Sequence, residues 1–242
     1  MSAVERDLRP AMSRAECGGL TLRLAGARAT LKASGALWLH ASRALVVADL
    51  HLEKGSAYAA RGQLLPPYDT RDALARLARA AQAVQAEILV LLGDSFHDAG
   101  GEARLHPGDA DTLHALASER RLIWVVGNHD REGPRRLPGE VVETLTLDRL
   151  LLVHEPAPGA VEGEIAGHLH PAARVASARG SVRSRCFLTD GRRLILPAFG
   201  AYAGGLNVRH RAFDGLFGPG LMACALGRER VHALAFDVLI GD

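Results

Sequence analysis

Short apolar runs alternate with amphipathic segments through the first half of the chain. The apolar runs at residues 43–48, 88–92 and 122–126 predict buried strands. Between them, residues 70–85 and 108–119 carry apolar positions at helical spacing and predict two helices. Because strands and helices alternate in this order, we expect a largely parallel sheet with right-handed crossovers.

The second half of the chain has shorter apolar runs, which glycine or charged residues interrupt. It predicts a more β-rich region, with a hairpin turn at Asp190 and Gly191 and strands at residues 150–153, 164–166, 183–189, 192–196 and 231–238. This change favours an α/β fold with two packed, mixed β-sheets flanked by α-helices over a single doubly wound sheet. No repeat or linker divides the sequence, so we expect a single domain over residues 1–242, with a variable N-terminal extension over residues 1–18.

Composition excludes several classes of protein. The chain has 242 residues, of which 48% are hydrophobic and 23% charged, as in ordinary globular domains. Its apolar runs are too short to cross a bilayer, and its N-terminal residues lack the apolar core of a secretory signal. The three cysteines, Cys17, Cys186 and Cys224, are too far apart for a zinc knuckle or a disulfide framework. We therefore expect a cytoplasmic protein without a membrane anchor.

The charge of the chain is nearly balanced, at +2, and does not by itself indicate a partner. Of the 29 basic residues only Lys32 and Lys54 are lysines, and arginine binds phosphate oxygens through a planar, bidentate fork. Residues 171–193 hold one acidic residue, Asp190, against six arginines: Arg174, Arg179, Arg183, Arg185, Arg192 and Arg193. This excess predicts either a nucleic-acid footprint or a solvated strand face, and the sequence favours neither.

Metal-ligand residue types follow five of the apolar runs. They are Asp49, His51, Asp94, Asn128, His154, His168 and His170. Ligands of α/β sheets gather beyond the carboxyl ends of the strands, so these side chains are expected to lie together. Within the pairs Asp49/His51 and His168/His170 the spacing of two would place both side chains on one side of an extended segment.

The chemistry of this set indicates a metal centre. Four imidazoles argue against calcium or a magnesium-only site, whereas mixed nitrogen and oxygen ligands suit manganese, iron or zinc. Seven ligands are too many for one ion with an open position, but they suit two ions if a carboxylate bridges them. Two divalent cations against two aspartates leave a net positive charge, which attracts a phosphate and lowers the pKa of a bridging water.

Together these motifs resemble the calcineurin-like metallophosphoesterase superfamily. The resemblance is carried by Asp49-Leu50-His51, Gly93-Asp94, Gly127-Asn128-His129-Asp130, His154 and Gly167-His168-Leu169-His170. Residues 93–97 resemble the second motif of the Mre11-type nucleases. Residues 49–56, 65–71 and 196–202 are similar to the PdeM family of ligase-associated DNA-damage-response endonucleases.

The resemblance implies a four-layer fold, in which two β-sheets lie between helices, and two divalent metal ions, with Mn²⁺ expected first and iron or zinc as alternatives. Asp49, His51, Asp94 and His170 would bind the first ion. Asp94 would bridge to the second, which Asn128, His154 and His168 would also bind.

The implied activity is that of a DNA endonuclease in DNA repair, which hydrolyses phosphodiesters with a hydroxide that bridges the two metals. His129 would protonate or stabilise the leaving oxygen, because a histidine pKa lies near neutral pH. His97 would contact a phosphate oxygen or orient the scissile group. Asp130 would either orient His129 or cap a turn, and the sequence does not decide between these roles.

The substrate and partners follow less directly. Arg174, Arg209 and Arg211 are candidates to hold the backbone of DNA, and the family likeness alone implies a helicase, an exonuclease and a DNA ligase as partners. One alternative is a phosphodiesterase for a nucleotide or another small metabolite. Another is a non-catalytic interaction module on the same fold, although such proteins lose metal ligands and this chain has the full set. Its oligomeric state is not indicated.

Overall fold

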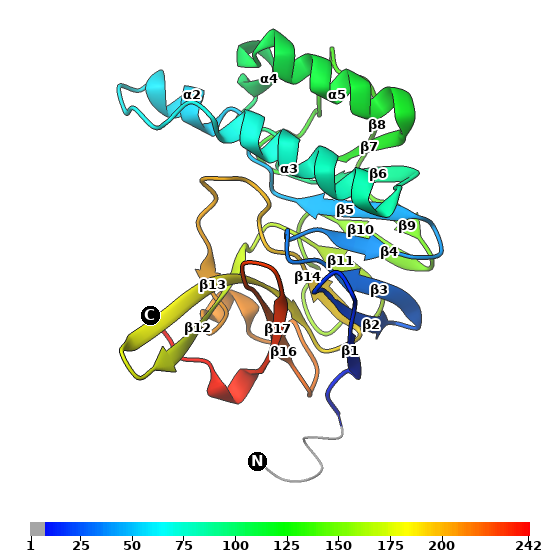
Figure 1. The fold of residues 1–242 in the computed structure, drawn as a ribbon, viewed down its shortest axis with the longest axis vertical. Coiled ribbons are helices and arrows are strands. Elements are labelled where there is room, and N and C mark those ends of the chain that lie inside the picture. The colour runs from blue at the N-terminus through cyan, green and yellow to red at the C-terminus, as the bar shows by residue number, and fades with distance from the viewer. Residues whose placement is uncertain (1–7) are drawn as a thin grey trace.

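The structure is a computed structural model that describes residues 8–242 (Figure 1). Residues 1–7 of the predicted N-terminal extension lie outside the described residues, and the extension stays a prediction. Within the remainder of that segment, a short strand, β1 (Met12–Arg14), pairs with the next strand of the sheet. In the described part of the chain, no helix is both long and apolar enough to cross a membrane.

An eight-stranded sheet contains most of the first half of the chain, and its strands lie in sequence order. After β1 come β2 (Leu20–Leu24), β3 (Ala27–Leu31), β4 (Leu37–Leu39), β5 (Ala44–Ala48), β6 (Ile88–Leu92), β7 (Arg121–Val125) and β8 (Glu140–Val142). The strands from β1 to β5 pair antiparallel, whereas those from β5 to β8 pair parallel, as the alternation of strands and helices predicts. The first four strands, β1 to β4, and the last strand, β8, have no counterpart in the sequence prediction.

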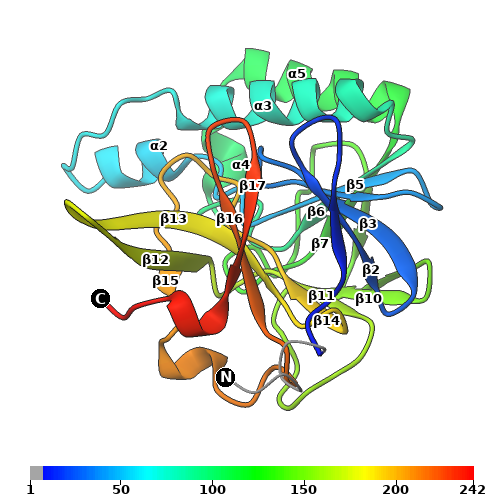
Figure 2. The same ribbon diagram turned by 60° about the horizontal axis from the view of Figure 1, so that its bottom comes forward.

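A nine-stranded mixed sheet contains the second half of the chain. Seven strands lie in the order β15-β12-β13-β14-β11-β10-β9, while β16 pairs with β13 and β17 pairs with β16. Their bounds are β9 (Leu145–Leu147), β10 (Leu150–Val153), β11 (Glu164–Ala166), β12 (Pro171–Ser177), β13 (Gly180–Thr189), β14 (Arg193–Ile195), β15 (Leu206–Asn207), β16 (Met222–Leu226) and β17 (Val231–Ala235). Figure 2 shows the long β12–β13 hairpin extending away from the sheets.

The α-helices of the described chain lie on one side of the eight-stranded sheet (Figure 1). They are α2 (Lys54–Ala59), α3 (Asp69–Val84), α4 (Gly101–Arg104) and α5 (Pro107–Glu119). Two 3₁₀-helices, η1 (Arg211–Phe213) and η2 (Phe236–Val238), belong to the other side of the molecule, where they cover the nine-stranded sheet. The strand predicted over residues 231–238 is therefore wrong in its last three residues, which form η2.

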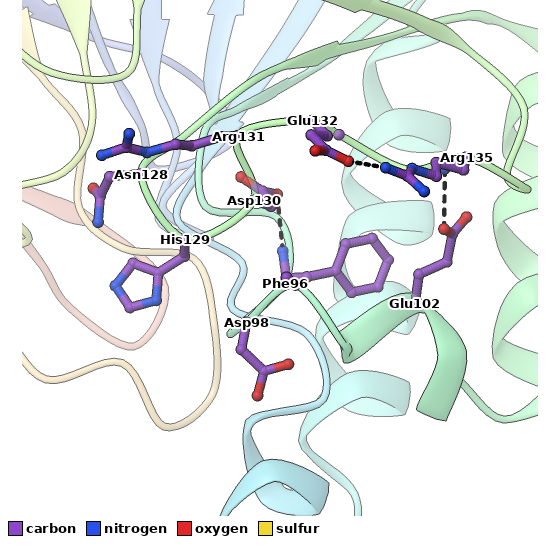
Figure 3. A pocket seen from close by; sticks show the side chains of 11 residues that line it. Phe96, Asp98, Glu102, Asn128, His129, Asp130, Arg131, Glu132 and Arg135 are labelled. Carbon is purple, nitrogen blue, oxygen red and sulfur yellow. Dashed lines mark hydrogen bonds and ion pairs between the residues drawn. The ribbon is translucent and has the colours of Figure 1, made fainter.

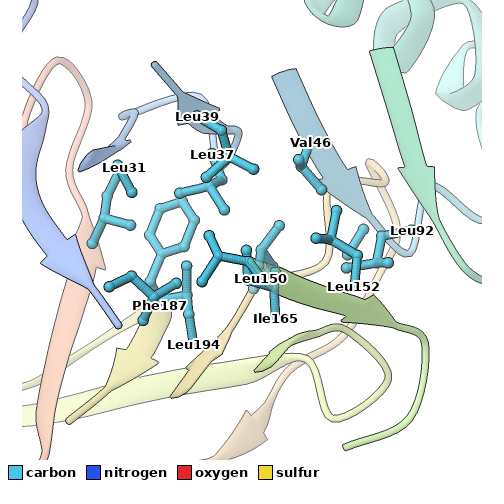
Figure 4. Close-up of a cluster of buried hydrophobic side chains, with 14 of the residues drawn as sticks. Leu31, Leu37, Leu39, Val46, Leu92, Leu150, Leu152, Ile165, Phe187 and Leu194 are labelled. Carbon is cyan, nitrogen blue, oxygen red and sulfur yellow. The ribbon is translucent and has the colours of Figure 1, made fainter. Parts of the chain in front are cut away.

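Three apolar clusters hold these layers together. Between the sheets, Leu31, Leu37 and Val46 of the first sheet pack against Phe187 and Leu194 of the second, all fully buried (Figure 4). A second cluster joins the first sheet to α3 and α5, and a third lies under η1 and η2. The two packed mixed sheets with few helices confirm the α/β class predicted from the sequence.

Candidate metal centre and active site

The predicted ligands of both sheets meet at the carboxyl ends of their strands. β5 and β6 are parallel neighbours, so the residues that follow them are adjacent: the His51 N–H donates to the Asp94 carbonyl oxygen at 2.9 Å. β10 and β11 of the second sheet are also parallel, and His154 and His168 follow them. The first sheet therefore contributes Asp49, His51, Asp94 and Asn128, and the second contributes His154, His168 and His170.

One group of ligand atoms comprises Asp49, His51 and His170, whose atoms lie within 4.8 Å of one another. His51 Nε2 lies 3.2 Å from His170 Nε2, and His170 Nε2 lies 3.4 Å from Asp49 Oδ1. The Asp49 carboxylate has no exposed surface, and both of its oxygens accept the backbone N–H of His168. This group could hold a metal ion.

A second group comprises Asp94, His154 and His168. His154 Nε2 lies 3.4 Å from Asp94 Oδ1, 3.2 Å from His168 Nδ1 and 2.8 Å from Asn128 Oδ1. The two groups adjoin, because His154 Nδ1 lies 3.7 Å from Asp49 Oδ1 and His51 Nε2 lies 4.0 Å from Asp94 Oδ2. Asp94 therefore lies where one carboxylate reaches imidazoles of both groups.

The backbone geometry of the ligand pairs differs from the sequence prediction. Neither pair is extended: Asp49, His51, Asp94, His168 and His170 all have φ between 43° and 67°. This left-handed region disfavours non-glycine residues, and it persists where surrounding contacts impose it, often at functional sites. The side chains converge because tight left-handed turns follow the strands. The prediction that each pair lies on one side of an extended segment is therefore wrong.

Glycine precedes several ligands because the site leaves no room for a Cβ atom. A Cβ at Gly93 would lie 2.0 Å from His154 Nδ1, and one at Gly127 would lie 2.2 Å from Asp94 Oδ1. A Cβ at Gly167 would lie 2.7 Å from Asp49 Oδ2. In each case the glycine of one strand end accommodates the ligand of another, which explains why the motifs begin with this residue.

The buried imidazoles are held neutral, as metal ligands must be. Burial, with smaller contributions from the neighbouring His170 and His129, lowers the pKa of His51 to about 2. Burial also lowers the pKa of His154 to about 4, although the Asp49 carboxylate opposes this shift. Within residues 8–242, the Nδ1 atoms of His51 and His154 are buried and have no hydrogen-bond partner. His154 Nδ1 lies 3.7 Å from Asp49 Oδ1, and an unpartnered imidazole nitrogen beside a carboxylate fits a divalent metal ion.

Comparison with known proteins agrees with this geometry. A family model described as calcineurin-like phosphoesterase matches residues 42–180, which is more than half of the chain and includes all seven candidate ligands. The chain belongs to this family. No curated protein sequence gives a significant match.

Among solved structures, Pseudomonas putida nuclease MPE is similar to this phosphoesterase, with a TM-score of 0.68 and 29% sequence identity. The match covers 89% of this chain and 100% of that chain. Yfce, a phosphoesterase from E. coli, matches with a TM-score of 0.39 and 17% identity over 79% of this chain and 98% of that chain.

The two candidate catalytic histidines lie beside the first ligand group. The ring centroids of His51 and His129 are 5.2 Å apart, and those of His97 and His129 are 5.7 Å apart. His129 Nδ1 lies 2.7 Å from the His97 carbonyl oxygen, which can only accept, so Nδ1 carries the proton and donates. His129 Nε2 lies 3.9 Å from Asp94 Oδ2, on a side chain that is 39% exposed. Burial and the Lys54 charge lower the pKa of His97.

Asp130 of this phosphoesterase serves the loops and not His129. Its Oδ2 accepts the backbone N–H groups of Ser95 and Phe96, and its Oδ1 accepts that of Gly127. Burial raises the pKa of the carboxyl, although these three donors oppose the rise. Asp130 therefore ties the loop after β7 to the loop after β6, which decides a choice that the sequence left open.

Replacing Asp130 with alanine should lower the free energy of unfolding by about 3 kcal/mol, because three buried N–H groups lose their acceptor. Urea denaturation followed by circular dichroism measures this loss. Asp130→Asn keeps one acceptor oxygen, so its free energy of unfolding should fall by a smaller amount. Asp111→Ala, on the exposed face of α5, is the matched control. An Asp130→Ala protein as stable as the unmodified one would contradict the role as a loop tie.

The arginines predicted to bind DNA are mostly engaged within the protein. The Arg174 side chain donates to Ser181 Oγ and the Gly241 carbonyl oxygen, and that of Arg209 donates to the carbonyl oxygens of Leu239 and Phe236. Arg211 is exposed on η1. For these three, DNA binding stays a prediction.

Arg193 fits neither alternative given for the arginine-rich residues 171–193, a nucleic-acid footprint or a solvated strand face. Its side chain has no exposed surface and lies 2.9 Å from Glu164 Oε1, and its guanidinium donates to the carbonyl oxygens of Ala157, Gly159 and Leu216. The two residues are direct partners of parallel strands β11 and β14. Arg193 therefore stabilises the loops behind His154 and offers nothing to a ligand.

One basic residue beside the ligands was not predicted from the sequence to belong to the site. Lys54, the first residue of α2, donates from Nζ to the Tyr202 carbonyl oxygen at 3.1 Å, and its charge contributes to the lowered pKa values of His51 and His97. The signal available in the sequence was its place three residues after His51, in a chain with only two lysines.

Proposed function

We propose that this chain is a metal-dependent phosphodiesterase that uses two divalent cations, with Mn²⁺ as the first candidate, and that it acts as a DNA endonuclease in DNA repair. One observation carries the proposal: two groups of ligands, each drawn from both sheets, adjoin at Asp94 and His154. Seven ligand side chains in this arrangement suit two ions, and family membership supports a hydrolase of phosphate esters.

In this proposal each group holds one cation. Asp49, His51, Asp94 and His170 bind the first, and Asp94, Asn128, His154 and His168 bind the second. The cations supply Lewis acidity, which attracts a phosphate and lowers the pKa of water.

Two histidines of the chain would contact the substrate and protonate its leaving oxygen. His129 carries a proton on Nδ1, held by the His97 carbonyl oxygen, and presents Nε2 toward Asp94 and solvent. In the imidazolium form Nε2 also carries a proton, and His129 donates this second proton to the leaving oxygen and becomes a neutral imidazole. The His97 ring lies 5.8 Å from those of His51 and Tyr58, where it can contact a phosphate oxygen or orient the scissile group.

Two observations bear on the substrate. Similarity to a Pseudomonas putida nuclease over 89% of the chain supports a nucleic acid as the substrate. The internal contacts of Arg174, Arg209 and Arg193 favour the second candidate, a phosphodiesterase for a nucleotide or another small metabolite. These guanidinium groups are engaged within the protein, so fewer arginines remain to contact the phosphates of a long strand. The repair partners and a cytoplasmic location stay predictions.

The purified protein with Mn²⁺ should hydrolyse bis-p-nitrophenyl phosphate, and a chelator should abolish the activity. Plasmid DNA, assayed with each divalent metal in turn and beside a panel of cyclic dinucleotides, separates the two substrate classes. Cleavage of DNA that weakens as salt rises supports the endonuclease. Cleavage of dinucleotides alone supports the small-metabolite enzyme. Absence of bound metal after manganese loading would favour a non-catalytic module instead.

A further inference from the structure

A cavity of about 480 Å³ opens beside the metal-ligand groups, at Asn128 and His129 (Figure 3). Its wall comes from the loop after β6, the start of α4 and the loop after β7, including Phe96, Glu102 and Arg131. This volume lies within the range of small-molecule pockets. The cavity therefore has room for a part of the substrate that extends past His129.

Four carboxylates line this cavity, and each is already engaged. Asp98 Oδ1 accepts Arg104 Nη2 at 2.8 Å, Asp130 accepts backbone N–H groups, and Glu132 pairs with Arg135. Glu102 accepts the backbone N–H groups of residues 135, 136 and 137. These contacts fix the loop after β7 to α4, so the wall is built before a ligand arrives.

Arg131 differs from every other charged residue of the cavity. Within the part of the chain that the structure describes, its guanidinium has no hydrogen bond and no ion pair. In Figure 3 its side chain extends to the same side as Asn128 and away from Arg135. A free guanidinium in a pocket whose acids are neutralised attracts an anion, and its fork matches two phosphate oxygens.

The position of the cavity indicates which part of the substrate it receives. The scissile phosphate belongs at the metal ligands, and His129, which lies between them and the cavity, would protonate the leaving oxygen. Whatever is attached to that oxygen therefore extends into the cavity. We propose that Arg131 binds a second phosphate, carried on the leaving side of the scissile diester. This inference rests on the proposed function, and the second phosphate is supplied either by a DNA strand or by a short nucleotide.

The direct test compares Arg131→Ala on two substrates with Mn²⁺. Its kcat/KM on an oligothymidylate should fall by about tenfold or more, and the slope of log activity against log salt should fall by about one. The fall in kcat/KM of Arg131→Ala on bis-p-nitrophenyl phosphate, which has no second phosphate, should be at least several times smaller. Arg131→Lys should recover part of the loss, because it keeps the charge but not the fork.

Arg136→Ala is the matched control, because Arg136 is exposed on the same loop and only its backbone contacts Glu102. Equal losses of Arg131→Ala on both substrates, or equal losses of Arg131→Ala and Arg136→Ala on DNA, would overturn the proposal.

A second comparison separates this inference from the proposed function. Thymidylyl-thymidine has one diester and no other phosphate, and the same dinucleotide with a phosphate at each end supplies the second anion. The unmodified protein should prefer the phosphorylated form, and Arg131→Ala should lose the preference. If the dinucleotides are cleaved and DNA is not, the endonuclease fails while this inference stands. Equal rates on both dinucleotides refute the role of Arg131. Hydrolysis of bis-p-nitrophenyl phosphate alone refutes both.

Discussion

Replacing Asp94 with alanine is expected to lower kcat/KM for bis-p-nitrophenyl phosphate by about a thousandfold, as expected when several kcal/mol of Lewis-acid stabilisation are lost. Asp94 is the carboxylate that reaches imidazoles of both groups: His154 Nε2 lies 3.4 Å from one oxygen and His51 Nε2 lies 4.0 Å from the other. Its removal should therefore reduce metal content as well as turnover. Elemental analysis beside the hydrolysis assay measures both effects.

Two further variants keep this prediction testable. Asp94 Oδ1 also accepts the backbone N–H of His129, so alanine could disturb the loop. Asp94→Asn retains an acceptor oxygen and removes the charge, and it should remain folded while losing most activity. Asp72→Ala, an exposed aspartate on α3, should behave like the unmodified protein. If Asp94→Asn folds, hydrolyses the diester normally and binds its full complement of metal, the shared position of Asp94 is refuted.

Replacing His129 with alanine should lower kcat by about a hundredfold, the scale of general acid catalysis, while metal content stays the same. Within the described residues Nε2 makes no hydrogen bond and is the ring nitrogen available for this role, whereas Nδ1 donates to the His97 carbonyl oxygen. His129 also belongs to a third group of clustered ligand atoms, with His51 and His97. Turnover and metal stoichiometry must therefore be measured on the same sample.

The outcome separates a proton donor from a ligand. A His129→Ala protein that loses turnover but keeps its metal supports the role of His129 as the general acid. One that loses a metal ion shows that His129 binds the ion. His114→Ala, on an exposed face of α5, controls for the loss of a histidine from the surface.

The central strands of the first sheet followed from local patterns. The strands near residues 44–48, 88–92 and 121–125, and helix α3 between the first two, follow the apolar periodicity to within one or two residues. The N-terminal strands β1 to β4, which pair antiparallel with one another, were not predicted. Neither were β8, β9, β12, β15 and β16.

The ligand residues could also be predicted from the pattern of apolar runs. Polar residues at the ends of apolar runs meet when parallel strands share one edge, and all seven predicted ligands do lie together there. The sequence did not predict the backbone conformation that brings Asp49 and His51 together. Left-handed backbone at non-glycine residues persists only where tertiary contacts impose it.

The sequence by itself therefore determined which residues could form strands, helices and a metal centre, since periodicity and residue chemistry are properties of neighbouring positions. Only the tertiary structure decided the use of the charged residues. Arg193 is buried against Glu164, Asp130 joins two loops, and Arg131 faces a cavity with no partner among residues 8–242. Each outcome depends on segments far apart in the chain, whose pairing is set by how strands and loops pack and not by the residues on either side.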